Sequence, residues 1–219
     1  MLYPVILFIH VLLGSSALLS GFGAMIVKKS GGLHTRFGAV YYWSMILTSV
    51  SALIMTILKF NSFLLAIGVF TLYLTHTGKI AIDNWRKKEA WSYSMNQWMP
   101  SFVGFIVSVW MIGWPVFLMV YSGKTFVPIL SVFGIILLLN TIQDHLLLRK
   151  EDNRIPKNRR FLIQHIGKMG GSYIAAVTAF LVNNVTISPG WIMWILPTVI
   201  GSILITYSIN TWRKKLKLK

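Results

Sequence analysis

The sequence contains no cysteine, which excludes disulfides, thiolate metal ligands and cysteine nucleophiles. Charge is also scarce: 12% of the 219 residues are charged, against about 25% in soluble domains, and only five residues are acidic. Three motifs that carry chemistry are absent from the sequence: the HExxH zinc motif, a glycine-rich phosphate loop and a serine nucleophile elbow. This composition argues against a soluble domain and against several familiar enzyme classes.

Apolar residues make up 55% of the chain, and the mean hydropathy is +0.67. They form seven runs, each close to the roughly 20 residues that a helix needs to span a bilayer. In lipid a helix satisfies its own backbone hydrogen bonds. We therefore predict an all-α membrane protein, a seven-transmembrane helix bundle that is a single domain over 1–212 with a basic cytoplasmic tail at 213–219. The predicted helices are 2–27, 38–58, 62–82, 98–121, 125–148, 161–184 and 191–212.

The Lys and Arg residues are distributed very unevenly between the two alternating sets of connections. Eighteen fall on one set and two on the other, with Lys168 inside a helix. Because positive loops face the cytoplasm, this bias predicts an amino terminus outside and a carboxyl terminus in the cytoplasm. The larger set is Lys28, Lys29, Arg36, Lys79, Arg86, Lys87, Lys88, Arg149, Lys150, Arg154, Lys157, Arg159, Arg160, Arg213, Lys214, Lys215, Lys217 and Lys219, and the smaller set is Lys59 and Lys124.

A net charge of +16 would often suggest nucleic acid as a partner. Here the basic residues stand in short clusters between apolar runs, which membrane topology explains. The expected partner is the lipid bilayer, with no nucleic acid. The first run has no positive residue before it and two lysines directly after it, the reverse of a signal peptide, so we expect it to remain as an anchor.

Two runs carry small residues at helical spacing, which predicts close contacts with neighbouring helices. The first run has His10, Gly14, Ala17, Gly21 and Ala24 on one face, and the sixth has His165, Met169, Ser172, Ala176 and Ala179.

The stretch 140–171 holds four ionisable residues near or inside apolar segments: Asp144, His145, His165 and Lys168. Such residues are costly in lipid and mark functional sites. Asp144 and Lys168 lie on sequential helices at depths about one turn apart, and neither charge would be tolerated alone. We predict that they form a buried pair, the candidate catalytic residues, which either holds two helices in register or relays protons.

All five histidines are candidate cofactor ligands. His34, His76, His145 and His165 fall in the predicted cytoplasmic half, and His10 alone lies in the outer half. A metal site for zinc would use His76, His145, His165 and Asp144. Alternatively, two of the histidines would clamp a haem b, with Lys168 or Lys79 facing a propionate or a quinone.

The segment from His10 to Met45 resembles a family of predicted bacterial multi-pass membrane proteins, the domain of unknown function 2306. The family joins a helix bearing a histidine to a turn of the Gly-His-Arg-x2-Gly type. Here Thr35 separates the His from the Arg, which departs from that pattern. The resemblance implies a bacterial inner (cytoplasmic) membrane and a conserved helical core, and it supplies no reaction. The matching residues are His10, Gly14, Gly21, Gly31, Gly32, His34, Arg36 and Gly38.

Three functions follow as hypotheses from a polar, histidine-lined site that opens toward the cytoplasm. The first is membrane redox work with haem b and quinone. The second is a zinc-dependent hydrolase that acts on a lipid substrate. The third is a proton-coupled transporter that uses the pair of Asp144 and Lys168.

Overall fold

The computed structural model describes residues 2–29, 32–86, 95–122, 128–149 and 157–216. These residues form seven α-helices and no strand. The predicted all-α class and number of helices are confirmed, and the largest shift is in the second helix, which begins at Gly32 rather than at 38. The helices are α1 (Leu2–Ile26), α2 (Gly32–Leu58), α3 (Ser62–Arg86), α4 (Met95–Ser122), α5 (Pro128–Arg149), α6 (Lys157–Asn184) and α7 (Ile192–Lys215).

Five helices are long and apolar enough to cross a membrane: α1, α2, α3, α4 and α7. The apolar part of α5 is shorter, Leu130–Leu146. The first turn of α6 carries Lys157, Arg159 and Arg160, and Lys168 follows further in, which lowers its hydropathy. The chain is therefore a helical protein of the multi-pass membrane type.

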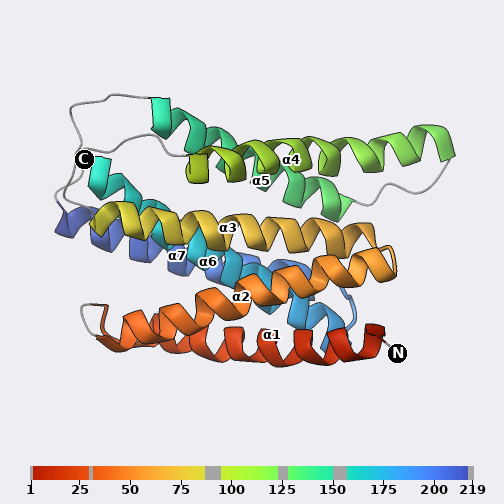
Figure 1. Cartoon of the computed structure of the whole chain (residues 1–219), viewed down its shortest axis with the longest axis horizontal. Coiled ribbons are helices and arrows are strands. Elements are labelled where there is room, and N and C mark those ends of the chain that lie inside the picture. The colour runs from red at the N-terminus through yellow and green to blue at the C-terminus, as the bar shows by residue number, and fades with distance from the viewer. Residues whose placement is uncertain (1, 30–31, 87–94, 123–127, 150–156, 217–219) are drawn as a thin grey trace.

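The helices run up and down in alternation, so that consecutive helices are antiparallel (Figure 1). The α1–α2 pair lies on one side of the bundle and the α4–α5 pair on the other, with α3 between them. α6 packs along α3, touches α1, and carries α7 on its far side. α3 contacts α2, α4, α5 and α6, and α6 also contacts α1 and α7. A side chain between α3 and α6 is therefore shielded from lipid.

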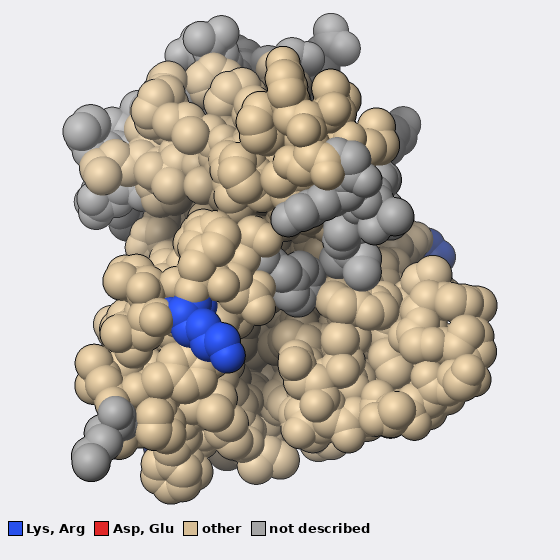
Figure 2. Space-filling view, turned by 90° about the vertical axis from the view of Figure 1, so that its right-hand side faces the viewer, with Lys and Arg blue, Asp and Glu red and all other residues tan. Residues whose placement is uncertain are grey.

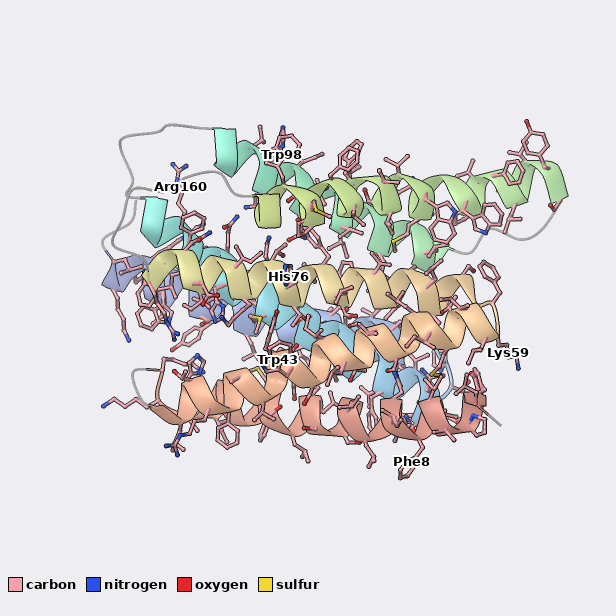
Figure 3. The ribbon with its side chains drawn as sticks, viewed as in Figure 1. Phe8, Trp43, Lys59, His76, Trp98 and Arg160 are labelled. Atoms are coloured by element: carbon pink, nitrogen blue, oxygen red, sulfur yellow. The ribbon has the colours of Figure 1, made fainter. Side chains whose placement is uncertain are left out.

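Basic residues gather where α1, α3, α5 and α7 end, which we call the basic end. Arg160 lies at this end and Lys59 at the opposite one (Figure 3). Figure 2 shows the opposite end, where the described surface is almost entirely uncharged. Described residues at the basic end are Lys28, Lys29, Arg36, Arg86, Arg149, Lys157, Arg159, Arg160, Arg213, Lys214 and Lys215, whereas Lys87, Lys88, Lys124, Lys150, Arg154, Lys217 and Lys219 lie outside the described residues.

The small residues predicted to line helix contacts do so in α1. A Cβ atom at Gly21 would lie 2.5 Å from Cδ2 of Tyr173 and 2.9 Å from Cδ2 of Tyr41. Ala17, also on this face, is fully buried. In lipid, where hydrophobicity does not drive helices together, such close backbone approach supplies the packing energy. It seats α1 against both α2 and α6.

We expect the turn between α2 and α3 and the end of α7 to be labelled from opposite sides of a membrane. The chain has no cysteine, so Lys59→Cys and Lys215→Cys each introduce a single thiol. In sealed vesicles a membrane-impermeant maleimide should reach one of these thiols, and the other should react only after detergent is added. Labelling of both thiols in the same intact vesicles would contradict the alternating arrangement of the helices.

Candidate functional site

The carboxylate of Asp144 on α5 lies at the centre of a buried polar cluster. Its Oδ2 atom accepts hydrogen bonds from the Lys168 ammonium of α6 and from the Tyr73 hydroxyl of α3. Its Oδ1 atom accepts a hydrogen bond from Nε2 of Gln164, also on α6, at 3.1 Å. One carboxylate therefore joins three helices, and the predicted pairing of Asp144 with Lys168 is confirmed.

The side chains of this cluster are almost completely removed from the surface. Asp144 and Lys168 are each 6% exposed, and Tyr73 is 4% exposed. The Lys168 Nζ atom also lies 5.2 Å from the centroid of the Tyr73 ring, within the range of a cation–π contact. The ammonium is thus stabilised both by a carboxylate and by an aromatic face.

Small residues allow the helices to come this close. A Cβ atom at Gly78 of α3 would lie 3.0 Å from Sδ of Met169 and 3.2 Å from Cβ of Lys168. On the other side of α3, a Cβ atom at Gly104 of α4 would lie 3.0 Å from the Tyr73 ring. Tyr73 is therefore held between α4 and the ion pair.

The partners of Asp144 differ in how visible they are in the sequence. Gln164 precedes Lys168 by four residues, so the two share a face of α6, and this spacing was a usable signal that sequence reasoning missed. Tyr73 offered no such signal, because one tyrosine in an apolar helix is ordinary. The sequence therefore predicted the charges of the cluster but not its neutral members.

His165 lies on α6 one turn before Lys168. Its Nδ1 atom donates to the carbonyl oxygen of Gly78 at 2.9 Å, because a carbonyl can only accept. This bond joins α6 to α3 immediately beside the ion pair. The ring of His165 is fixed in position by the backbone of the neighbouring helix.

His76 on α3 contacts a different partner, with 3.4 Å between its Nδ1 atom and the hydroxyl of Tyr42. The neighbouring cation Lys79 forms an ion pair with Asp83 one turn further on, at 2.6 Å. Both members of this pair are about two-fifths exposed, so it lies at the margin of the bundle. His76, Lys79 and Asp83 lie three and four residues apart on one side of α3, separate from the buried cluster.

Two of the remaining histidines link α1 to α2 near opposite ends of these helices. His10 donates from Nδ1 to the Thr48 carbonyl oxygen at 3.1 Å, and His34 donates from Nδ1 to the Ala24 carbonyl oxygen at 2.9 Å. His145 instead meets the ring of Trp98 edge-on, at 5.2 Å between centroids.

The zinc ligands predicted from the sequence, His76, His145, His165 and Asp144, are not brought together. No three His, Asp or Glu side chains among the described residues are grouped as a metal site. The physical reason is that each histidine already has a partner on a different neighbouring helix, which orients the rings apart. The haem prediction needs only two histidines and stays a prediction.

The chain matches no protein-family model, no curated protein and no solved structure. Its resemblance to the family of predicted bacterial membrane proteins, carried by residues between His10 and Met45, stays a prediction.

We expect Lys168→Met to destabilise the protein more than the double variant Asp144→Asn with Lys168→Met. The single change leaves an unpaired buried carboxylate, which costs roughly 3–5 kcal/mol, whereas the double change removes both charges. Unfolding in mixed micelles of mild detergent and rising dodecyl sulfate measures the free energy. Lys214→Met, at an exposed position, is the control and should be close to wild type. Equal losses in the single and double variants would mean that the two charges are not coupled.

Proposed function

We propose that this chain is a seven-span, proton-coupled membrane transporter in which Asp144 binds the transported proton. The single observation that carries the proposal is the buried contact of Asp144 with Lys168. Ionisable residues in membrane interiors mark ion pathways and proton relays. A buried ion pair is rarely retained for stability, because well-packed apolar side chains of similar volume stabilise a protein as well or better.

The proposed orientation has the amino terminus outside and the basic end in the cytoplasm. It is supported by the basic residues at the ends of α1, α3, α5 and α7 and by their scarcity at the opposite end. α5 and α6 complete the seven spans in this proposal. α6 tolerates its polar residues because it packs between α1, α3 and α7 rather than in lipid. A bacterial inner membrane is the proposed location.

The chemistry of the pair suggests how protons and substrate are coupled. A proton that binds the Asp144 carboxylate removes the counter-charge of Lys168, and the ammonium then needs another anion in a medium of low dielectric constant. An anionic group of a substrate would take that place. Tyr73 and Gln164, which donate hydrogen bonds to the ionised carboxylate, would reorient when it is protonated. We therefore propose a small organic anion as the substrate class.

We expect a pH jump on reconstituted protein to produce a transient current that depends on Asp144. Solid-supported-membrane electrophysiology detects this charge movement with protons alone as the probe, before any substrate is known. Asp144→Asn should abolish the current because the amide cannot bind the proton. Adding organic anions of different sizes should then convert the transient current of the wild type into sustained transport.

Asp83→Asn is the matched control, because Asp83 is the other acidic residue in the described part of the chain and is half-exposed at the basic end of α3. It should leave the current at the wild-type level. A current that survives in Asp144→Asn, or a wild-type current no larger than that of empty liposomes, would overturn the proposal.

A second candidate, redox work with haem b, is favoured by one observation. His34 and His165 both lie in the halves of their helices that are nearest to the basic end. Both rings donate from Nδ1 to a backbone carbonyl, which leaves Nε2 as the ligand atom. Protein expressed with ample haem should then show a Soret band that is lost in His165→Ala. A featureless spectrum after haem supplementation would eliminate this candidate.

A further inference from the structure

A stripe of hydroxyl groups runs along the side of α2 that packs on α1, and its Tyr41 end reaches α6. Tyr41, Ser44, Thr48 and Ser51 are spaced three and four residues apart, so they share one face of the helix. The first and last residues of the stripe are ten positions apart, which is about 15 Å along the axis at 1.5 Å per residue. All four side chains are at least partly buried. The polar groups of this stripe therefore lie inside the bundle rather than in lipid.

One end of the stripe carries a titratable group from α1. His10 is 2.9 Å from the Ser51 hydroxyl, measured from its Nδ1 atom, and the same atom donates to the Thr48 carbonyl oxygen. The Ser51 hydroxyl in turn donates to that carbonyl, at 2.8 Å, and so accepts from His10. Nδ1 therefore carries the hydrogen, and Nε2 of the neutral ring is free to accept a proton.

The middle and the other end of the stripe are bonded to α1 and α6. The Ser44 hydroxyl bonds to the Ser16 hydroxyl of α1 at 3.0 Å. The Tyr41 hydroxyl bonds to the Ser172 hydroxyl of α6 at 2.6 Å, and both groups are buried. Ser172 lies one turn beyond Lys168 on the same face of α6. The stripe thus runs from Ser51, the partner of His10, to Tyr41, whose partner Ser172 lies one helical turn from Lys168.

A separate observation concerns the side of α3 that faces α2 and α6. The hydroxyl of Thr75 on α3 is completely buried and has no hydrogen-bond partner among the described residues. One turn away on the same face of α3, Thr71 bonds to Ser49 of α2 at 2.9 Å. One turn away in the other direction, Gly78 packs against Lys168. Thr75 therefore lies on α3 between the contact of α3 with α2 and its contact with α6. Buried hydroxyls that lack a protein partner are normally satisfied by internal water.

We propose that His10 and this hydroxyl stripe form the proton path between the membrane face opposite the basic end and the pair of Asp144 and Lys168. This inference rests on the proposed function. A proton adds to Nε2 of His10 and the Nδ1 proton passes to Ser51, so that the ring returns to neutrality. Each hydroxyl or water then accepts one proton and passes on its own. The last transfer protonates the Asp144 carboxylate, and no other bond changes.

The geometry fits such a path because neighbouring hydroxyls of the stripe are one turn, about 5 Å, apart along the helix. One water molecule spans a gap of this size with two hydrogen bonds. The alternative is that the hydroxyls only join helices, since hydrogen bonds between serine and threonine side chains are common in membrane proteins. A proton path requires His10 to titrate, whereas a purely structural contact requires only its hydrogen bonds.

The variant His10→Asn separates these two roles. Its side-chain amide can still donate to the Thr48 carbonyl from a position close to that of Nδ1, but it cannot carry a proton. We expect the pH-jump current to rise about a hundredfold more slowly or worse, as for loss of a general acid–base group. Imidazole added to the buffer at that face should restore the rate in His10→Ala. Vesicles are sorted by biotin-maleimide capture of Lys59→Cys, the shared background, so that this face is outward.

Thr56→Ala is the control, because Thr56 is a buried hydroxyl of α2 that bonds only within its own helix, at 3.0 Å. It should keep the wild-type rate. If His10→Asn does not fold, Ser51→Ala tests the path instead and should also slow the current. A wild-type rate in the folded His10 or Ser51 variant, with no effect of imidazole, overturns the path. In that case the Asp144→Asn variant shows whether the proposed function also fails. Loss of its current means that the function stands without the path, whereas a retained current means that the proposed function itself has failed.

Discussion

A carboxylate and an ammonium that are both removed from water cannot remain charged unless they meet, and this requirement constrains the centre of the bundle. Asp144 and Lys168 come from α5 and α6, and Tyr73 adds α3 to the same contact. The relative depth and rotation of the three helices are therefore fixed within about the length of a hydrogen bond. Gly78 and Gly104 make this possible, because side chains at these positions would separate α3 from its neighbours.

The outer helices depend on a different interaction. In lipid an apolar helix gains little from hiding its side chains, so close packing and hydrogen bonds between helices must hold it. α1 is seated by Gly21 against two tyrosines and by the bonds of His10 and Ser16 to α2. α7 uses the same principle on α6, where Gly201 lies so close to the Ile174 side chain that a Cβ atom would not fit. These contacts also place the hydroxyl stripe of α2 against α1, with its Tyr41 end at α6.

Two polar networks thus share α6, one around Asp144 and one along α2. They meet within a turn of each other, since Ser172 follows Lys168 by four residues. The histidines, by contrast, are dispersed over both ends of the bundle and bond to separate helices. This distribution fits the proposed role of the polar groups in proton movement better than a role in binding a metal ion. It also gives the proposed transporter an asymmetric interior, with most of its titratable groups toward the basic end.

The sequence by itself determined the seven helices, their alternation and the pairing of Asp144 with Lys168. Hydropathy and loop charge are local properties that can be read from the sequence. A buried charge needs a partner of opposite charge, and few candidates exist in a chain with so few charged residues in its apolar runs. Only the tertiary structure decided that Tyr73 and Gln164 complete the site and that the predicted zinc ligands lie apart. The reason is that lipid is as apolar as leucine, so the hydrophobic pattern does not mark which face of a membrane helix points inward. The rotation of each helix is set by packing against its neighbours, and a single sequence does not record it.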